Sequence, residues 1–152
     1  MPTYAENTTV SVERSQAEVE RILQRYGASS FMRGWDRERA VLAFTINKRQ
    51  IRMIVAMPAR DDFKYTAQGK LRISADAITA SWEQACRQRW RALALVVKAK
   101  LEAVEAGIST FEDEFLAHIV LPDGSTTGQW MKPQIQRAYE TADMPPLLGS
   151  GV

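Results

Sequence analysis

The sequence predicts an α+β fold: a β-α-β-β-β antiparallel sheet packs on one long helix, and a small helical C-terminal part follows. Three observations predict it. Apolar residues recur every three or four positions between residues 74 and 107, which is the spacing of one helix face. Apolar and polar residues alternate in three short runs between residues 30 and 57, which is the spacing of strands. Glycine and proline divide the segment after Gly107 into short pieces.

The size and composition are those of one soluble globular domain: 152 residues, of which 45% are apolar and 25% charged. No apolar run approaches the roughly 18 residues of a membrane span. The N-terminus lacks the basic and apolar regions of a signal peptide, and the single cysteine, Cys86, has no partner for an intrachain disulfide. We therefore expect a cytoplasmic protein without a membrane partner. Its single domain comprises the sheet with the first helix (1–58), a basic loop (59–73), the long helix (74–107), C-terminal helices (108–143) and a tail (144–152).

Charge is unevenly distributed along the chain. Residues 31–100 carry 15 Lys or Arg and 6 Asp or Glu, a net of +9, whereas residues 101–152 carry 2 and 8, a net of −6. This pattern favours a polyanionic partner, head-to-tail self-association, or neutralisation of one segment by the other. Two solvated faces without a partner are the alternative.

The first 58 residues carry the predicted sheet and one helix. Residues 8–12 predict a short strand. The segment Ser15-Gln16-Ala17-Glu18 matches a capping box, so we expect a helix from there to Gly27. Residues 30–35, 40–46 and 50–57 predict three strands, which short polar turns make antiparallel neighbours. One face of the middle strand carries Leu42, Phe44 and Ile46, and Pro58 ends the sheet.

The basic loop, residues 59–73, has neither a helical nor a strand period. Long loops inside compact domains are usually functional or disordered. This one combines cations with aromatic side chains, so it is a candidate contact for phosphate and base, with a solvated linker as the alternative.

The long helix is predicted from Ser74, its N-cap, to Gly107, its stop signal. A helix over residues 75–106 would be about 48 Å long. That length exceeds the width of so small a domain, so the helix either bridges subunits or forms the spine of the fold. Its apolar face comprises Ile78, Trp82, Cys86, Trp90, Leu93, Val97, Leu101 and Val104.

Two further helices are predicted after Gly107. Thr110 caps the first, which carries Phe111, Phe115, Leu116 and Ile119. After a turn at residues 122–124, the last helix begins near Pro133, because proline suits the first helical position, and stops at Met144-Pro145-Pro146.

The residues for enzymatic chemistry are sparse. His118 is the only histidine, and Cys86 on the apolar face is typical of a small core residue. Glycine-rich phosphate loops, dinucleotide fingerprints and C-x-x-C motifs are absent from the sequence, so we expect no cofactor and no enzymatic activity. Two acidic clusters could hold Mg²⁺: helix capping explains residues 112–114, and Asp61-Asp62 is the better candidate, with a solvated turn as the alternative.

A binding surface is the remaining prediction. Interleaved cations and aromatic side chains suit a single-strand nucleic-acid site, because cations contact phosphates while flat rings stack on bases. Trp82 and Trp90 are expected in the core, and Glu83 could pair with Arg87 on the helix surface. The candidate contacts are Arg33, Arg52, Arg60, Phe63, Lys64, Tyr65, Lys70, Arg72, Arg87 and Arg91.

Several stretches of the chain carry a family resemblance: W-E-Q-A-C-R-Q-R-W-R-A-L-A-L-V-V-K-A-K-L-E-A-V-E-A-G, F-E-D-E-F-L-A-H-I-V-L-P-D-G, R-Y-G-A, M-P-A-R-D-D and M-P-P-L-L. They cover nearly the whole sequence, which resembles a family of small proteins of tailed bacteriophages and prophages. The resemblance implies a host-cell cytoplasmic location and no particular activity. The predicted architecture is also similar to the core of phage single-strand annealing proteins of the Erf and RecT kind, which form rings or filaments on DNA.

The leading hypothesis is therefore an oligomeric, non-enzymatic protein of phage type that binds nucleic acid, with single-stranded DNA favoured and annealing in recombination as its role. Two alternatives stay open. One is a protein-interaction module, such as an inhibitor of a host factor or an assembly component, that uses the long helix. The other is a small metal-dependent nuclease built on Asp61, Asp62 and a helix glutamate.

Overall fold

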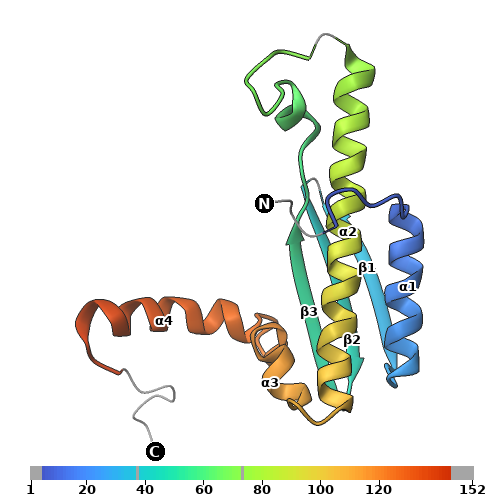
Figure 1. Ribbon diagram of the computed structural model, residues 1–152. Helices are drawn as coiled ribbons and strands as arrows, with labels where there is room; N and C mark the ends of the chain where they lie inside the picture. Colours follow the sequence, from blue (N-terminus) through green and yellow to red (C-terminus); the bar gives the residue numbers. More distant parts are fainter. Residues whose placement is uncertain (1–4, 37, 73, 145–152) are drawn as a thin grey trace, which may run out of the picture.

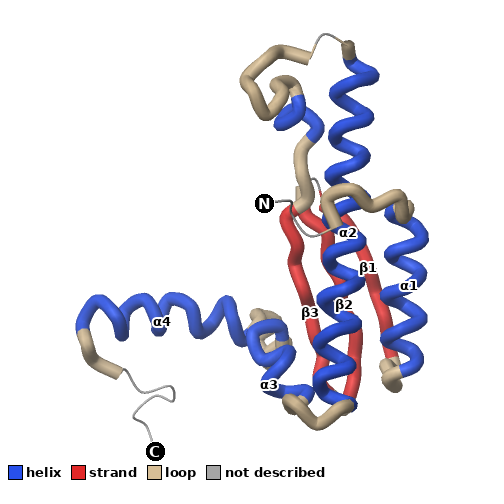
Figure 2. Tube along the Cα trace, viewed as in Figure 1, coloured by secondary structure: helices blue, strands red, loops and turns tan. Residues whose placement is uncertain are grey.

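The protein is described by a computed structural model that covers residues 5–36, 38–72 and 74–144. Two helices cover one face of a three-stranded antiparallel sheet, and a third helix projects away from this body (Figures 1 and 2). The α+β class, the antiparallel sheet and the long helix are confirmed. The elements are α1 (Val12–Arg25), β1 (Ser30–Asp36), β2 (Arg39–Ile46), β3 (Arg49–Ala56), the 3₁₀ helix η1 (Arg60–Phe63), α2 (Ala75–Glu105), α3 (Phe111–Phe115), the 3₁₀ helix η2 (Leu116–His118) and α4 (Thr127–Thr141).

The N-terminal prediction is wrong in two respects. Residues 8–11 form no strand, and α1 begins one turn earlier than the capping box at Ser15 suggests. The cap is Ser11, whose hydroxyl accepts a hydrogen bond from the Arg14 amide. Both serines fit the cap pattern, but the earlier start places Ser15, Val19 and Leu23 on one helix face against the core. Gly27 ends the helix as predicted, with φ of 90°.

The three predicted strands are confirmed, in the order β1-β2-β3. Residues paired directly across antiparallel strands project on the same side of a sheet. Phe31, Phe44 and Ile51 form one such row, and Arg33, Leu42 and Met53 form the next. These rows face α1 and α2, where Leu42, Phe44 and Ile51 are at most 1% exposed.

The opposite side of the sheet, which we call the outward face, carries Met32, Gly34, Val41, Ala43 and Ile54. It is open to solvent around β1 and the C-terminal part of β3: Met32 is 71% exposed and Ile54 is 42% exposed. A half-covered antiparallel sheet normally presents polar side chains to water. The register also places Ser30, Thr45, Gln50, Arg39 and Arg52 on this side, so its apolar residues form a patch around Met32, Val41 and Ile54 among polar ones.

The long helix is confirmed from its Ser74 cap to the stop at Gly107, where φ is 76°. Only its C-terminal half packs on the sheet, where Trp90, Leu93, Val97 and Leu101 are buried. The N-terminal half extends beyond the sheet and packs against η1 and the basic loop (Figure 1). The helix is therefore the spine of the protomer.

The C-terminal part differs from the prediction in where its elements end and begin. Thr110 caps α3 as predicted, but α3 ends at Phe115, and Ile119 forms an antiparallel bridge with Ile51 of β3 instead of continuing the helix. The last helix begins at Thr127, so Pro133 lies inside it. A capping box between Thr126 and Gln129 sets the start, since it satisfies amides that the proline position would leave unpaired. The predicted stop at Pro145-Pro146 lies outside the described residues.

Candidate nucleic-acid interface

A groove of about 800 Å³ opens where the N-terminal end of α1, the β1–β2 end of the sheet and the middle of α2 meet. Its walls carry three tryptophans and three charged side chains: Trp35, Trp82, Trp90, Glu13, Arg33 and Arg39. A smaller hollow of about 340 Å³ adjoins it, shares Val12, Glu13, Trp82 and Cys86 with it, and adds Ser11, Glu83 and Arg87. Aromatic and cationic side chains therefore converge at this end of the molecule.

The groove exists because the sheet and α2 extend past the end of α1. Trp35 belongs to the side of the sheet that faces the helices, since it is paired with the buried Ala40, yet its side chain is 83% exposed. Trp90 is buried, as predicted for a core residue. Trp82 is only half-buried, and its indole Nε1 donates a 2.8 Å hydrogen bond to the Pro58 carbonyl, which fixes the segment leading from β3 into the basic loop.

Two predicted arginines, Arg33 at the groove and Arg87 at the adjoining hollow, donate hydrogen bonds to neutral partners. Arg33 Nη1 donates to Gln16 Oε1 at 2.6 Å. Arg87 donates through Nε and Nη2 to Gln84 Oε1, in place of the predicted pair with Glu83. Because both acceptors are neutral amides, both guanidinium groups retain a field that attracts anions.

The basic loop is folded against α2 and is not irregular along its length. Arg60 donates to the Thr79 hydroxyl and the Ala75 carbonyl, and Arg72 donates to the Phe63 and Tyr65 carbonyls. A bridge between Tyr65 and Leu71 closes the loop. Both predicted arginines therefore shape the loop, although their neutral partners leave the charge in place.

Three predicted contacts in the loop face solvent. Tyr65 and Lys70 are exposed, and Lys64 lies 3.7 Å from the Asp61 carboxylate in an exposed pair, which solvent screens. Phe63 is half-buried. The loop and the groove are joined through Met57 and Pro58, which line the groove just before the loop begins.

Of the ten predicted contacts, Arg33 lines the groove, Arg87 lines the adjoining hollow and six lie in the basic loop. The other two, Arg52 and Arg91, lie elsewhere. Arg52 lies on the side of the sheet away from the helices and donates to the Gly124 carbonyl at 2.6 Å. Arg91 pairs with Glu18 between α2 and α1, where both side chains are largely shielded. These arginines connect elements of the fold.

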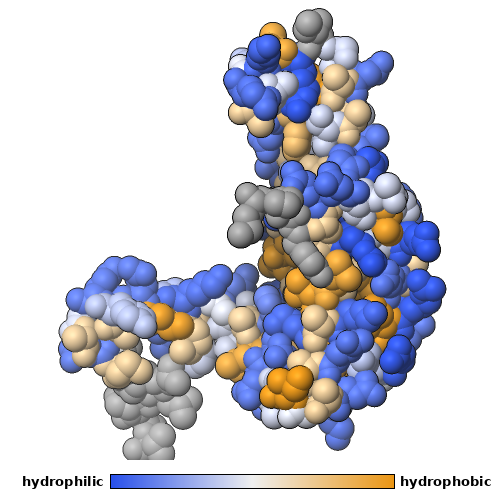
Figure 3. Space-filling view, viewed as in Figure 1, coloured by the Kyte–Doolittle hydropathy of each residue, from blue (hydrophilic) through white to orange (hydrophobic). Residues whose placement is uncertain are grey.

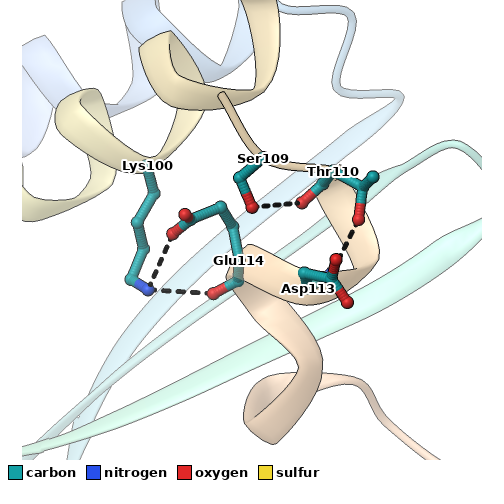
Figure 4. A network of polar contacts seen from close by, with 5 residues as sticks. All are labelled: Lys100, Ser109, Thr110, Asp113 and Glu114. Atoms are coloured by element: carbon teal, nitrogen blue, oxygen red, sulfur yellow. Dashed lines mark hydrogen bonds and ion pairs between the residues drawn. The ribbon is translucent and has the colours of Figure 1, made fainter. Parts of the chain in front are cut away.

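The acidic clusters have local structural partners. In η1, Asp62 accepts a hydrogen bond from the Ala59 amide. In α3, Lys100 Nζ contacts the Glu114 carbonyl at 2.9 Å and its carboxylate at 3.4 Å, while the Thr110 hydroxyl caps the Asp113 amide (Figure 4). Within the described ranges, no group of three His, Cys, Asp or Glu side chains is placed to hold a metal ion.

Cys86 and His118, the single cysteine and the single histidine of the sequence, are both shifted toward their neutral forms. Burial, then the nearby Glu83 carboxylate, raises the pKa of the Cys86 thiol, so Cys86 carries little of the thiolate needed for attack. Burial, then Lys100 and Lys132, lowers the pKa of His118. His118 lies in η2, next to α4 and away from the groove.

Sequence reasoning alone misses Arg39 and Gln16 as groove residues. Both lie in the groove wall, Arg39 at the start of β2 and Gln16 on α1. The signal that could have identified them is Trp35, a large aromatic side chain at the end of an alternating run, where the facing layer has already ended.

Comparison with known proteins finds no protein-family model, curated protein or solved structure that matches this chain. The resemblance to phage proteins and to single-strand annealing proteins stays a prediction. In the part of the chain that the structure describes, no helix has both the length and the apolar composition needed to span a membrane.

Proposed function

We propose that the protein binds single-stranded nucleic acid, with single-stranded DNA favoured, in the groove around Trp35 and along the adjoining basic loop. The observation that carries the proposal is the Trp35 indole, a large apolar ring that is 83% exposed beside the Arg33 guanidinium in a groove. Burying such a ring under a base recovers stacking energy of about 1–3 kcal/mol.

The arrangement also supplies a path for the phosphates. Arg33 and Arg87 line the two hollows, and Lys64 and Lys70 continue the positive charge along the loop. Glu13 lines both hollows and Glu83 lines the smaller one, and either carboxylate would repel a phosphate placed beside it. We therefore assign base stacking to Trp35, and contacts with the phosphate backbone to Arg33, Arg87 and the loop lysines. The groove is sequence-tolerant, because every base presents a flat face.

Fluorescence anisotropy with labelled single-stranded and duplex oligonucleotides tests the proposal. At about 50 mM salt we expect tight single-strand binding, and at about 200 mM a loss of one or more orders of magnitude, because bound phosphates release counterions. Trp35→Ala should weaken binding roughly 10- to 100-fold, because the base then has no ring to stack on. The double variant Lys64→Gln, Lys70→Gln should bind with a weaker dependence on salt. The slope of log affinity against log salt concentration should fall by about one for each lysine that no longer neutralises a phosphate.

Two matched controls lie on α4, at the other end of the molecule: Trp130→Ala removes another exposed tryptophan, and Arg137→Gln removes another exposed cation. Neither should change the affinity. Absence of binding at low salt, or equal losses in the Trp35 and Trp130 variants, would contradict the proposal. A protein partner bound with little salt dependence would instead favour an interaction module.

A further inference from the structure

Helix α4 stands away from the body of the protein (Figure 1), and its surface is mostly hydrophilic with a small apolar group (Figure 3). Helical spacing places Met131, Ile135, Ala138 and Tyr139 along one side; Ile135 is 48% exposed and Tyr139 87%. The opposite side carries Gln129, Arg137 and Glu140, and Trp130, seven residues before Arg137, lies on that side and is 40% exposed. An amphipathic helix is stable in water when its apolar side is covered, and the side with Ile135 and Tyr139 is left uncovered in the protomer. We call α4 the arm.

The direction of the arm is fixed by a packed joint. Gly128 lies so close to η2 that a Cβ atom there would be 2.9 Å from the Ala117 carbonyl oxygen. The Thr127 amide donates to the Ile119 carbonyl, and Thr126 forms the capping box. Arg52 holds the preceding turn by donating to the Gly124 carbonyl. The arm therefore projects because its base is built that way, and the joint keeps it off its own sheet.

The outward face of the sheet is the second surface without a cover. Besides the exposed Met32 and Ile54, it contains Gly34 in the interior of β1. Gly34 does not have a positive φ, and among the described residues no atom lies within 4 Å of the position that its Cβ would take. Neither backbone conformation nor crowding inside the protomer requires glycine there. Glycine in a strand interior is typical where another backbone approaches closely.

We propose that these two surfaces belong together, and that the arm of one protomer docks on the outward face of a second copy of this chain. The apolar patch in the middle of the outward face lacks a helix layer, and the arm is a helix that lacks a sheet. Each chain provides both halves, so a second copy completes both.

The dimensions agree with this assignment. The 15-residue arm is about 22 Å long, and the 8-residue strands β2 and β3 are about 26 Å long, so the arm fits within the sheet along the strands. Gly34 and Arg39 of the outward side also line the groove. Met32, Ile54, Ile135 and Tyr139 do not line it, so variants at these positions separate assembly from nucleic-acid binding.

Light scattering coupled to gel filtration tests the contact. We expect wild-type protein to have at least twice the 17.1 kDa mass of one chain. An arm variant, Ile135→Gln with Tyr139→Gln, and a face variant, Met32→Thr with Ile54→Thr, should each be monomeric. The changes replace exposed side chains with polar ones of suitable helix or strand propensity, and circular dichroism verifies folding. Arg137→Gln on the polar side of the arm and Arg21→Gln at an exposed position of α1 are the controls and should leave the mass unchanged.

Mixing the two monomeric variants is the decisive step. The arm variant retains an intact face and the face variant an intact arm, so one contact can form, and an equimolar mixture should give a one-to-one heterodimer. A monomeric wild type, an arm variant that still self-associates, or a mixture that stays monomeric would each overturn the proposal.

Discussion

At the scale of single residues, two serines one turn apart in α1 have opposite roles. Ser11 caps the helix by accepting a hydrogen bond from the Arg14 amide. Ser15 is fully buried, and its hydroxyl has no hydrogen-bond partner among the described residues. A buried polar group without a partner retains its desolvation cost.

Ser15→Ala is therefore expected to raise the free energy of unfolding by about 1 kcal/mol, since it removes that cost and alanine favours the helix. Ser11→Ala should lower it by about 1 kcal/mol, because the cap is removed. Urea denaturation of both variants measures the two changes. The reverse result, a destabilising Ser15→Ala with a neutral Ser11→Ala, would restore Ser15 as the cap.

Residue identity also explains why the candidate site could be predicted only in part. The cations and aromatic side chains of the loop were identifiable from their types and spacing. Their partners were not, because an arginine that donates to carbonyls, such as Arg72, and one that faces a groove, such as Arg33, have the same local sequence signals. The exposure of Trp35 depends on where α1 ends relative to the sheet, which is a tertiary property.

At the scale of elements, alternation predicted the three strands because one face of each is buried, and the 3.6-residue period predicted α2 because its C-terminal half packs on that face. The start of α4 was predicted wrongly although Thr126-Thr127-Gly128-Gln129 contains the capping-box pattern. The preference of proline for the first turn pointed to Pro133 instead. Two amides satisfied by the box, together with the packing of Gly128 on Ala117, set the actual start.

The joint between α2, η2 and α4 makes stability depend on pH through His118. Burial and the ammonium groups of Lys100 and Lys132 hold its pKa below the ordinary value of 6.5. The folded joint therefore prefers neutral histidine. Its contribution to stability is present above the unfolded pKa and is lost as pH falls through the lower, folded pKa, because the unfolded chain binds the proton more readily.

We expect the melting temperature of wild-type protein to fall between about pH 7.5 and about pH 5.5 by more than that of His118→Gln, in which this protonation is absent. Differential scanning calorimetry at both pH values measures the difference. Since all other titratable groups are common to both proteins, equal pH dependence would exclude His118 as the source.

At the scale of the whole molecule, the proposed functions lie at different places. The groove and the basic loop lie at one end, on the side of the sheet that faces the helices, whereas the arm begins at the other end (Figure 1). The arm variant can therefore lose assembly without losing the groove. An assembled protein carries several grooves at a fixed separation, and a strand bound in one is held near the next at high effective concentration.

A comparison of short and long oligonucleotides tests this coupling. A strand that fills one groove should bind the wild type and the Ile135→Gln, Tyr139→Gln variant equally, because Trp35 and the groove arginines are intact in both. A strand long enough to reach a second groove should bind the wild type about 10²-fold or more tightly than the variant, since only the assembled protein gains from multivalency. Anisotropy titrations at one salt concentration provide both comparisons. If the short strand also binds the variant more weakly, the arm contributes to the groove itself and the two surfaces are not separate. If length makes no difference to the wild type, the assembly does not align its grooves along one strand.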